Sequence, residues 1–92
     1  MNFEHHGVGQ DGYFRAVEDE TEAGRMTYLW LDKTKIIIDH TTVSPDFKGR
    51  NIGMQLLLEG VRFARENNLT IIPQCPFAKS VFEKQVEIQD VL

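Results

Sequence analysis

The segment Lys48-Gly49-Arg50-Asn51-Ile52-Gly53 places two glycines and two cations in one short loop. It follows an apolar run and precedes residues with helical spacing. In such a loop, unpaired backbone N–H groups and the positive end of the helix dipole converge on one point. The segment therefore predicts an anion-binding site that suits a small ligand.

Two side chains that can take part in bond making, His40 and Cys75, lie where apolar runs give way to polar residues. A thiolate can accept an acyl group and form a covalent intermediate. Histidine changes its charge near neutral pH, so it can act as a base or activate a thiol. The structural alternatives stay open, because a cysteine is often a small buried apolar residue and a histidine within a strand is often structural.

A strand, a helix and a second strand must position these residues. The run of isoleucines at 36–38 predicts a central strand over residues 35–43, and apolar spacing predicts a helix over residues 51–67. A short apolar strand follows at residues 69–73, which makes the two strands parallel. Ligands in such sheets bind beyond the carboxyl ends of the strands. We therefore expect His40, Thr41, the loop and Cys75 to converge.

The remaining sequence predicts an antiparallel meander and a second helix. Strands are expected over residues 13–18 and 25–31, joined by a polar loop at 19–24. Residues 3–12 indicate a short edge strand or an irregular lead-in, residues 77–86 a second helix, and residues 87–92 a tail. The predicted fold class is α/β (α+β): a mixed sheet of an antiparallel meander plus one parallel strand, with two helices, in one domain spanning residues 1–92.

Composition and charge disfavour several classes of function. The net charge of −4 disfavours nucleic-acid binding, which usually needs a basic surface. No apolar run approaches the roughly 20 residues that span a bilayer, and the N-terminus does not have the pattern of a secretory signal. The single cysteine cannot form an internal disulfide, which fits a reducing cytoplasm.

The histidine pair His5-His6 does not predict a metal site. Adjacent side chains of a strand point to opposite faces, and no other histidine or cysteine lies near in the sequence. We therefore predict no metal.

The loop at residues 48–53 matches neither of two familiar phosphate loops, the dinucleotide-binding glycine pattern and the P-loop. It resembles the pyrophosphate loop of the GNAT N-acetyltransferase superfamily, which opens a helix after a strand ending in Val-x-Pro. Val43-Ser44-Pro45 supplies that strand end. Lys48 takes the first position of the loop, usually glutamine or arginine, and Gly53 takes the last. Asn51 replaces the first glycine, and asparagine is the non-glycine residue that best tolerates unusual backbone angles.

The resemblance extends to a compact GNAT-like subfamily of about this length. Four segments match in the same order: Gly24-Arg25-Met26-Thr27-Tyr28, His40-Thr41-Thr42-Val43, the loop, and Cys75-Pro76-Phe77. The resemblance covers nearly the whole chain.

This resemblance implies binding of acetyl-CoA or CoA between the third and fourth strands of the predicted core. Loop amides from Lys48 to Gly53 would hold the pyrophosphate, helped by the Lys48 and Arg50 side chains. Backbone N–H groups near Val43 would face the thioester carbonyl, where charge develops during transfer. The implied cofactor-binding residues are Thr42, Val43, Lys48, Gly49, Arg50, Asn51, Ile52, Gly53, Phe77, Lys79 and Ser80.

The implied activity is acetyl transfer to the amine of a small molecule or a protein. Full-length relatives commonly use a tyrosine after the fourth strand as the acid, whereas this chain has Cys75 there. Cys75 and His40 are therefore the predicted catalytic residues. A second hypothesis is a CoA-binding or protein-interaction module without catalysis, and thiol release from acetyl-CoA distinguishes the two.

Overall fold

The computed structural model describes residues 1–8 and 11–92, which form a mixed five-stranded sheet with two α-helices and two short 3₁₀ helices. The sheet has the order β1-β2-β3-β4-β5; its first three pairings are antiparallel, and β4 and β5 are parallel. This confirms the predicted fold class. In chain order the elements are β1 (Asn2–Val8), β2 (Asp11–Glu18), β3 (Thr21–Asp32), β4 (Lys35–Val43), η1 (Pro45–Phe47), α1 (Ile52–Asn67), β5 (Thr70–Pro73), α2 (Pro76–Lys84) and η2 (Val86–Val91).

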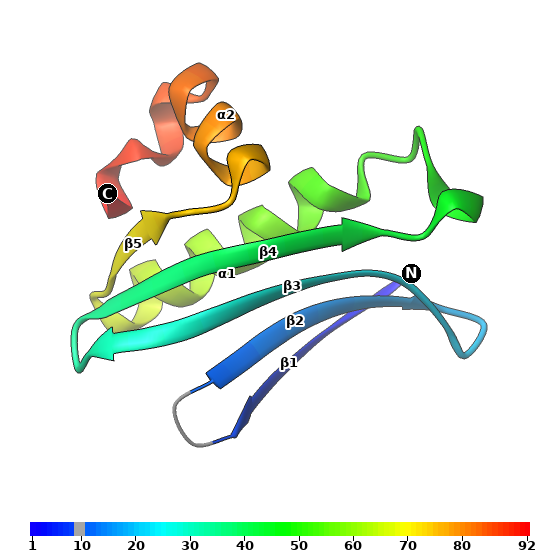
Figure 1. Cartoon of the computed structure of the whole chain (residues 1–92), viewed down its shortest axis with the longest axis horizontal. Coiled ribbons are helices and arrows are strands. Elements are labelled where there is room, and N and C mark those ends of the chain that lie inside the picture. Colours follow the sequence, from blue (N-terminus) through cyan, green and yellow to red (C-terminus); the bar gives the residue numbers. More distant parts are fainter. Residues whose placement is uncertain (9–10) are drawn as a thin grey trace.

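The core lies between the sheet and its helices (Figure 1). Helix α1 packs across β2, β3, β4 and β5, while α2 packs on β4 and β5. Gly60 makes the contact of α1 with β3 close, because a Cβ there would stand 2.8 Å from the Met26 methyl group. None of the helices in the described part of the chain is long and apolar enough to cross a membrane.

Two expectations about connecting segments are wrong. The predicted polar loop at residues 19–24 is only a turn at Asp19-Glu20, and β3 already begins at Thr21. Ala23 and Gly24 are buried against α1, so this part of the segment belongs to the core. The predicted tail forms η2, whose Ile88 and Val91 side chains are buried. In both cases a few small or apolar residues decide the structure, because their burial outweighs the polarity of their neighbours.

The predicted lead-in at residues 3–12 is a regular edge strand as far as the structure describes it. Strand β1 pairs with β2 over its whole length, from Asn2 opposite Val17 to Val8 opposite Asp11. Residues 9 and 10 lie outside the described residues.

A bulge in β4 changes which side chains face the helices. The pairing of β3 with β4 shifts between Thr27, which lies opposite His40, and Tyr28, which lies opposite Ile38. Asp39 is therefore the extra residue of a β-bulge. Before it, Ile36 and Ile38 face the core. Because side chains alternate along a strand, the extra residue turns Thr41 and Val43 to the same side.

Strands β4 and β5 pair only over the first part of β4. Their parallel register runs from Lys35 opposite Thr70 to Ile38 opposite Pro73, where β5 ends. The backbone N–H groups of Gln74 and Cys75 both donate to the Ile38 carbonyl, at 2.9 and 3.1 Å. The chain then leaves β4 and turns into α2, so the two strands separate (Figure 1).

Candidate functional site

The loop before α1 presents open backbone at a helix N-terminus. Asn51 is the N-cap of α1 in the left-handed conformation, with φ 61° and ψ 30°, and its side chain makes no capping hydrogen bond. Its carbonyl accepts the N–H of Gln55 at 3.1 Å. The N–H groups of the first helical turn have no partner within the helix. This end of α1 therefore offers its N–H groups and the positive end of its dipole to an anion.

A cleft of about 380 Å³ lies over this loop. Its sides are formed by the end of β4, the loop and the ring of Phe77 from α2. Gly53 makes this arrangement possible, since a Cβ there would stand 2.9 Å from the Phe77 ring. The lining residues are Thr41, Val43, Phe47, Lys48, Gly49, Asn51, Ile52, Gly53, Met54 and Phe77.

The two cations of the loop occupy different surroundings. Lys48 lines the cleft. The Arg50 guanidinium donates two hydrogen bonds to the Glu18 carboxylate, at 2.8 and 2.9 Å, and lies 5.2 Å from the centre of the Phe47 ring. The bond from Arg50 lowers the pKa of the Glu18 carboxyl, and the same bond raises the pKa of Arg50. The Arg50 side chain thus ties the loop to the end of β2.

Cys75 is the N-cap of α2 and is almost fully buried, with 5% of its surface exposed. Its Sγ accepts the backbone N–H of Ala78 at 3.3 Å and lies 3.5 Å from the Oγ1 of Thr41. Both contacts follow from the fold: Cys75 lies between β5 and α2, and the bulge turns Thr41 to the helix side of the sheet. The thiol therefore has a structural role as a helix cap.

Cys75 also lines a second hollow of about 550 Å³, together with Leu29, Asp39, His40, Thr41, Gln74, Pro76 and Phe77. Thr41 and Phe77 line both this hollow and the cleft. These two residues therefore form a wall common to the two spaces, and Thr41 contacts the thiol.

His40 lies at the rim of the second hollow rather than against the thiol. Its side chain is 79% exposed, and its Nε2 is 4.0 Å from an Asp39 carboxylate oxygen. That carboxylate accepts a hydrogen bond of 2.6 Å from the Thr27 hydroxyl, which fixes its orientation. The group in contact with the Cys75 Sγ is the hydroxyl of Thr41.

The structure brings together most of the residues predicted from sequence. Val43, Lys48, Gly49, Asn51, Ile52, Gly53 and Phe77 line the cleft, and His40 and Cys75 line the hollow beside it. The side chains of Thr42, Arg50, Lys79 and Ser80 are not among the residues that line either space.

Sequence reasoning did not select Asp39, Phe47, Met54 and Gln74 as site residues. Phe47 could have been identified from the sequence, because it is the aromatic residue just before the loop. Met54 could not, because its orientation depends on how α1 is rotated against the sheet. Within residues 1–8 and 11–92, no group of three or more potential ligands is arranged to hold a metal ion.

Comparison with known proteins identifies the family of this chain. Residues 12–91 match the family model of the GCN5-related N-acetyl-transferases. The solution structure of a GCN5-like candidate N-acetyltransferase from Staphylococcus aureus is 39% identical, with a TM-score of 0.71 over 96% of this chain and 85% of that one. No curated protein sequence matches the chain significantly.

More distant structures share the fold alone. The ribosomal-protein-alanine N-acetyltransferase of Brucella melitensis biovar Abortus 2308 is 17% identical, with a TM-score of 0.68 over 82% of this chain and 62% of that one. Tetrahymena GCN5 is 14% identical, with a TM-score of 0.68 over 83% of this chain and 50% of that one. The aminoglycoside N-acetyltransferase AAC(6')-Iy, solved in complex with CoA, is 13% identical, with a TM-score of 0.63 over 84% of this chain and 67% of that one. The family model matches residues 12–91, and the Staphylococcus aureus protein is 39% identical over 96% of this chain. This chain therefore belongs to the GCN5-related N-acetyltransferase family.

Proposed function

We propose that this protein is an acetyl-CoA-dependent N-acetyltransferase, in which the loop at residues 48–53 holds the cofactor and Cys75 lies at the point of transfer. The observation that carries the proposal is that the cleft over the loop and the hollow beside Cys75 share Thr41 and Phe77 as lining residues. An anionic cofactor held at the N-terminus of α1 can direct its reactive end toward Cys75 from there. Family membership supports the reaction class.

The residues present fit the pyrophosphate of CoA. The first turn of α1 offers N–H groups, and no side-chain cap from Asn51 competes for them. Gly49, at φ 79°, leaves the space beside the loop open, since a Cβ there would have nothing within 4 Å. Lys48 adds a positive charge at the same place. The backbone of Arg50 belongs to this loop, while its side chain serves the pair with Glu18.

The end of β4 offers donors for the acyl group. In the described chain, residues 39–43 of β4 have no parallel partner in β5, because β5 ends opposite Ile38. Backbone N–H groups of this segment that point away from β3, near Thr42 and Val43, can bind a carbonyl oxygen. Fixed donors at a developing oxyanion stabilise the transition state and need no reorganisation.

Cys75 gives the reaction a covalent route. The Cys75 Sγ forms a bond to the acetyl carbon while the thioester C–S bond breaks, and the departing thiolate takes the proton of the Cys75 thiol. An acceptor amine then forms the N–C bond while the Sγ–C bond breaks, and its proton returns to Sγ. The Ala78 N–H and the Thr41 hydroxyl can stabilise charge on the sulfur. His40, at the exposed rim, can take the proton of the incoming ammonium.

The acceptor is an amine of a small molecule or a protein. His40 is largely exposed, so the acceptor reaches the hollow from solvent. We place the reaction in the cytoplasm, which the single cysteine supports.

Two measurements test the proposal. CoA and acetyl-CoA should raise the melting temperature, because a ligand that binds only the folded state stabilises it. Thiol release from acetyl-CoA should then appear with one or more members of a panel of small amines and lysine peptides. A thermal shift without turnover would favour the non-catalytic CoA-binding module. Absence of a shift at millimolar CoA would overturn the proposal.

A further inference from the structure

Strand β1 forms an edge of the sheet and lacks most of the features that usually block strand addition. Natural edge strands are protected by short length, proline, lysine or bulges. Strand β1 has seven residues, contains neither proline nor lysine, and keeps one register with β2 throughout. No strand in the described part of the chain pairs with its outer side. The opposite edge, β5, has four residues and ends in Pro73.

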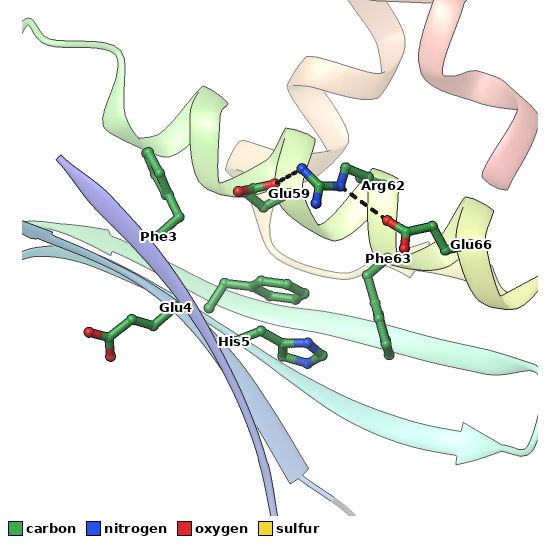
Figure 2. Close-up of a pocket in the computed structure, with 8 residues that line it drawn as sticks. Phe3, Glu4, His5, Glu59, Arg62, Phe63 and Glu66 are labelled. Atoms are coloured by element: carbon green, nitrogen blue, oxygen red, sulfur yellow. Dashed lines mark hydrogen bonds and ion pairs between the residues drawn. The ribbon is translucent and has the colours of Figure 1, made fainter.

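A hollow of about 260 Å³ accompanies this edge on its helix side (Figure 2). Phe3 and His5 from β1 and Phe63 from α1 line it, and Arg62 of α1 lies on its rim between Glu59 and Glu66. Glu4 also borders this hollow, but Figure 2 shows its carboxylate directed away from it, on the side of β1 opposite to His5. The two faces of β1 therefore differ: one is aromatic and the other is charged.

We propose that β1 pairs antiparallel with β1 of a second copy of this chain, with His5 opposite His5 across a two-fold axis. In this register Glu4 lies opposite His6 of the second copy, and Phe3 lies opposite Gly7. Each pair occurs twice because the interface is isologous. The two sheets then join into one continuous sheet, and the open N–H and C=O groups of both edges are satisfied.

Charge complementarity selects this register and a second copy as the occupant. Directly opposite side chains of antiparallel strands interact, and opposite charges there are favourable whereas like charges are not. Moving the axis from His5 to Glu4 would place the two Glu4 carboxylates opposite each other. Within one chain the Glu4 carboxylate lies 2.8 Å from the His6 Nε2 and 3.1 Å from the Arg15 Nε. With His5 on the axis, each Glu4 carboxylate also faces the His6 imidazole of the other copy, so carboxylates and imidazoles alternate across the interface. The sequence of β1 is thus complementary to itself.

The helix-side residues leave room for this pairing. The His5 ring stacks on Phe14 at 4.2 Å between centroids, and its Nε2 lies 2.6 Å from the Tyr28 hydroxyl. Each His5 ring therefore packs against its own sheet and does not occupy the space at the two-fold axis. A Cβ at Gly7 would have only the Tyr28 hydroxyl within 4 Å, at 3.7 Å. The ring of Phe3 from the second copy can cover that space, as aromatic residues do opposite edge glycines.

Sedimentation velocity on the full chain, at protein concentrations between about 10 µM and about 1 mM, can detect dimerisation through an interface of this small size. We expect a concentration-dependent dimer. Glu4→Lys places the introduced lysine opposite His6, and His6→Glu places two carboxylates opposite each other, so each should weaken dimerisation about tenfold or more. The double variant Glu4→Lys, His6→Glu restores opposite charges and should recover dimerisation.

Mixing the two single variants gives a second, independent readout. In a mixed dimer both cross-strand pairs carry opposite charges, so the mixture should dimerise more strongly than either variant alone. Glu83→Lys, on the exposed surface of α2, makes the same charge change away from the edge and should leave dimerisation unaltered. Circular dichroism checks that each variant is folded. A chain that stays monomeric at about 1 mM, or a dimer that both single substitutions leave intact, would overturn the proposal.

Discussion

The Oγ1 of Thr41 lies 3.5 Å from the Sγ of Cys75, although 34 residues separate them in the sequence. Two irregularities of the sheet create this contact. The bulge at Asp39 turns Thr41 toward the helices, and the early end of β5 at Pro73 places Cys75 beside the unpaired part of β4. The candidate active site therefore occupies the place where the regular sheet is interrupted.

Replacing Cys75 tests whether the thiol carries the acetyl group. Cys75→Ser keeps an acceptor for the Ala78 N–H, so the fold should remain stable, whereas Cys75→Ala loses the cap and should cost about 1 kcal/mol of unfolding free energy. Incubation of the wild-type protein with acetyl-CoA should add the mass of one acetyl group, and both variants should lack it. Full turnover in Cys75→Ser would show that the amine attacks the thioester directly.

The two loop cations should contribute unequally to CoA binding. Lys48→Ala removes a cation that lines the cleft, so the dissociation constant for CoA, measured by calorimetry, should rise about tenfold. Arg50→Ala should change it by less than about threefold, because that guanidinium is held by Glu18. Glu18→Gln, which releases Arg50, is the matched control and should not weaken binding. Equal losses in Lys48→Ala and Arg50→Ala would contradict this division of roles.

Gly53 should tolerate no side chain while Phe77 is present. A Cβ at this position would stand 2.9 Å from the Phe77 ring, so Gly53→Ala should cost about 1–3 kcal/mol of unfolding free energy and distort the cleft. Denaturant unfolding measures the cost. Phe77→Leu shortens the opposing side chain, and in that background Gly53→Ala should cost less. An equal cost in both backgrounds would show that the glycine serves another purpose.

His5 should make stability depend on pH. Burial, and secondarily the nearby His6, lower the pKa of His5 below its ordinary value of 6.5. The His5 ring therefore takes up a proton more readily in the unfolded chain than in the folded one. The unfolding free energy should be highest above about pH 6.5 and should decrease as the pH falls from there toward the folded-state pKa of His5. The measurement is denaturant unfolding at pH 7.5 and pH 5.5.

A His5→Gln variant separates this effect from the other titrating groups. It removes the ionisable ring but keeps a polar partner for the Tyr28 hydroxyl, which is 2.6 Å from the His5 Nε2. The loss of stability between the two pH values should be smaller in this variant than in the wild-type protein. An identical loss in both proteins would assign the pH dependence to another residue.

The sequence by itself determined the order of elements that builds the site. Local signals were sufficient there: the isoleucine run of β4, the helical spacing of α1, and the glycines and cations between them all depend on neighbours in the chain. The resemblance of the loop and the Cys-Pro-Phe segment to GNAT enzymes identified the family correctly. Where the local signal was polarity alone, at residues 19–24 and 87–92, prediction failed because distant core contacts decided the structure.

Only the tertiary structure decided which of the selected side chains meet. The bulge at Asp39 depends on the pairing of β4 with β3, so no local pattern shows that Thr41 rather than His40 touches Cys75. The bond of Arg50 to Glu18 likewise joins residues 32 positions apart, and it separates two neighbouring cations that look equivalent in the sequence. The sequence sets strand and helix tendencies through short-range sterics and hydrophobic spacing. The site arises from register, twist and packing between distant segments, which the folded chain fixes together.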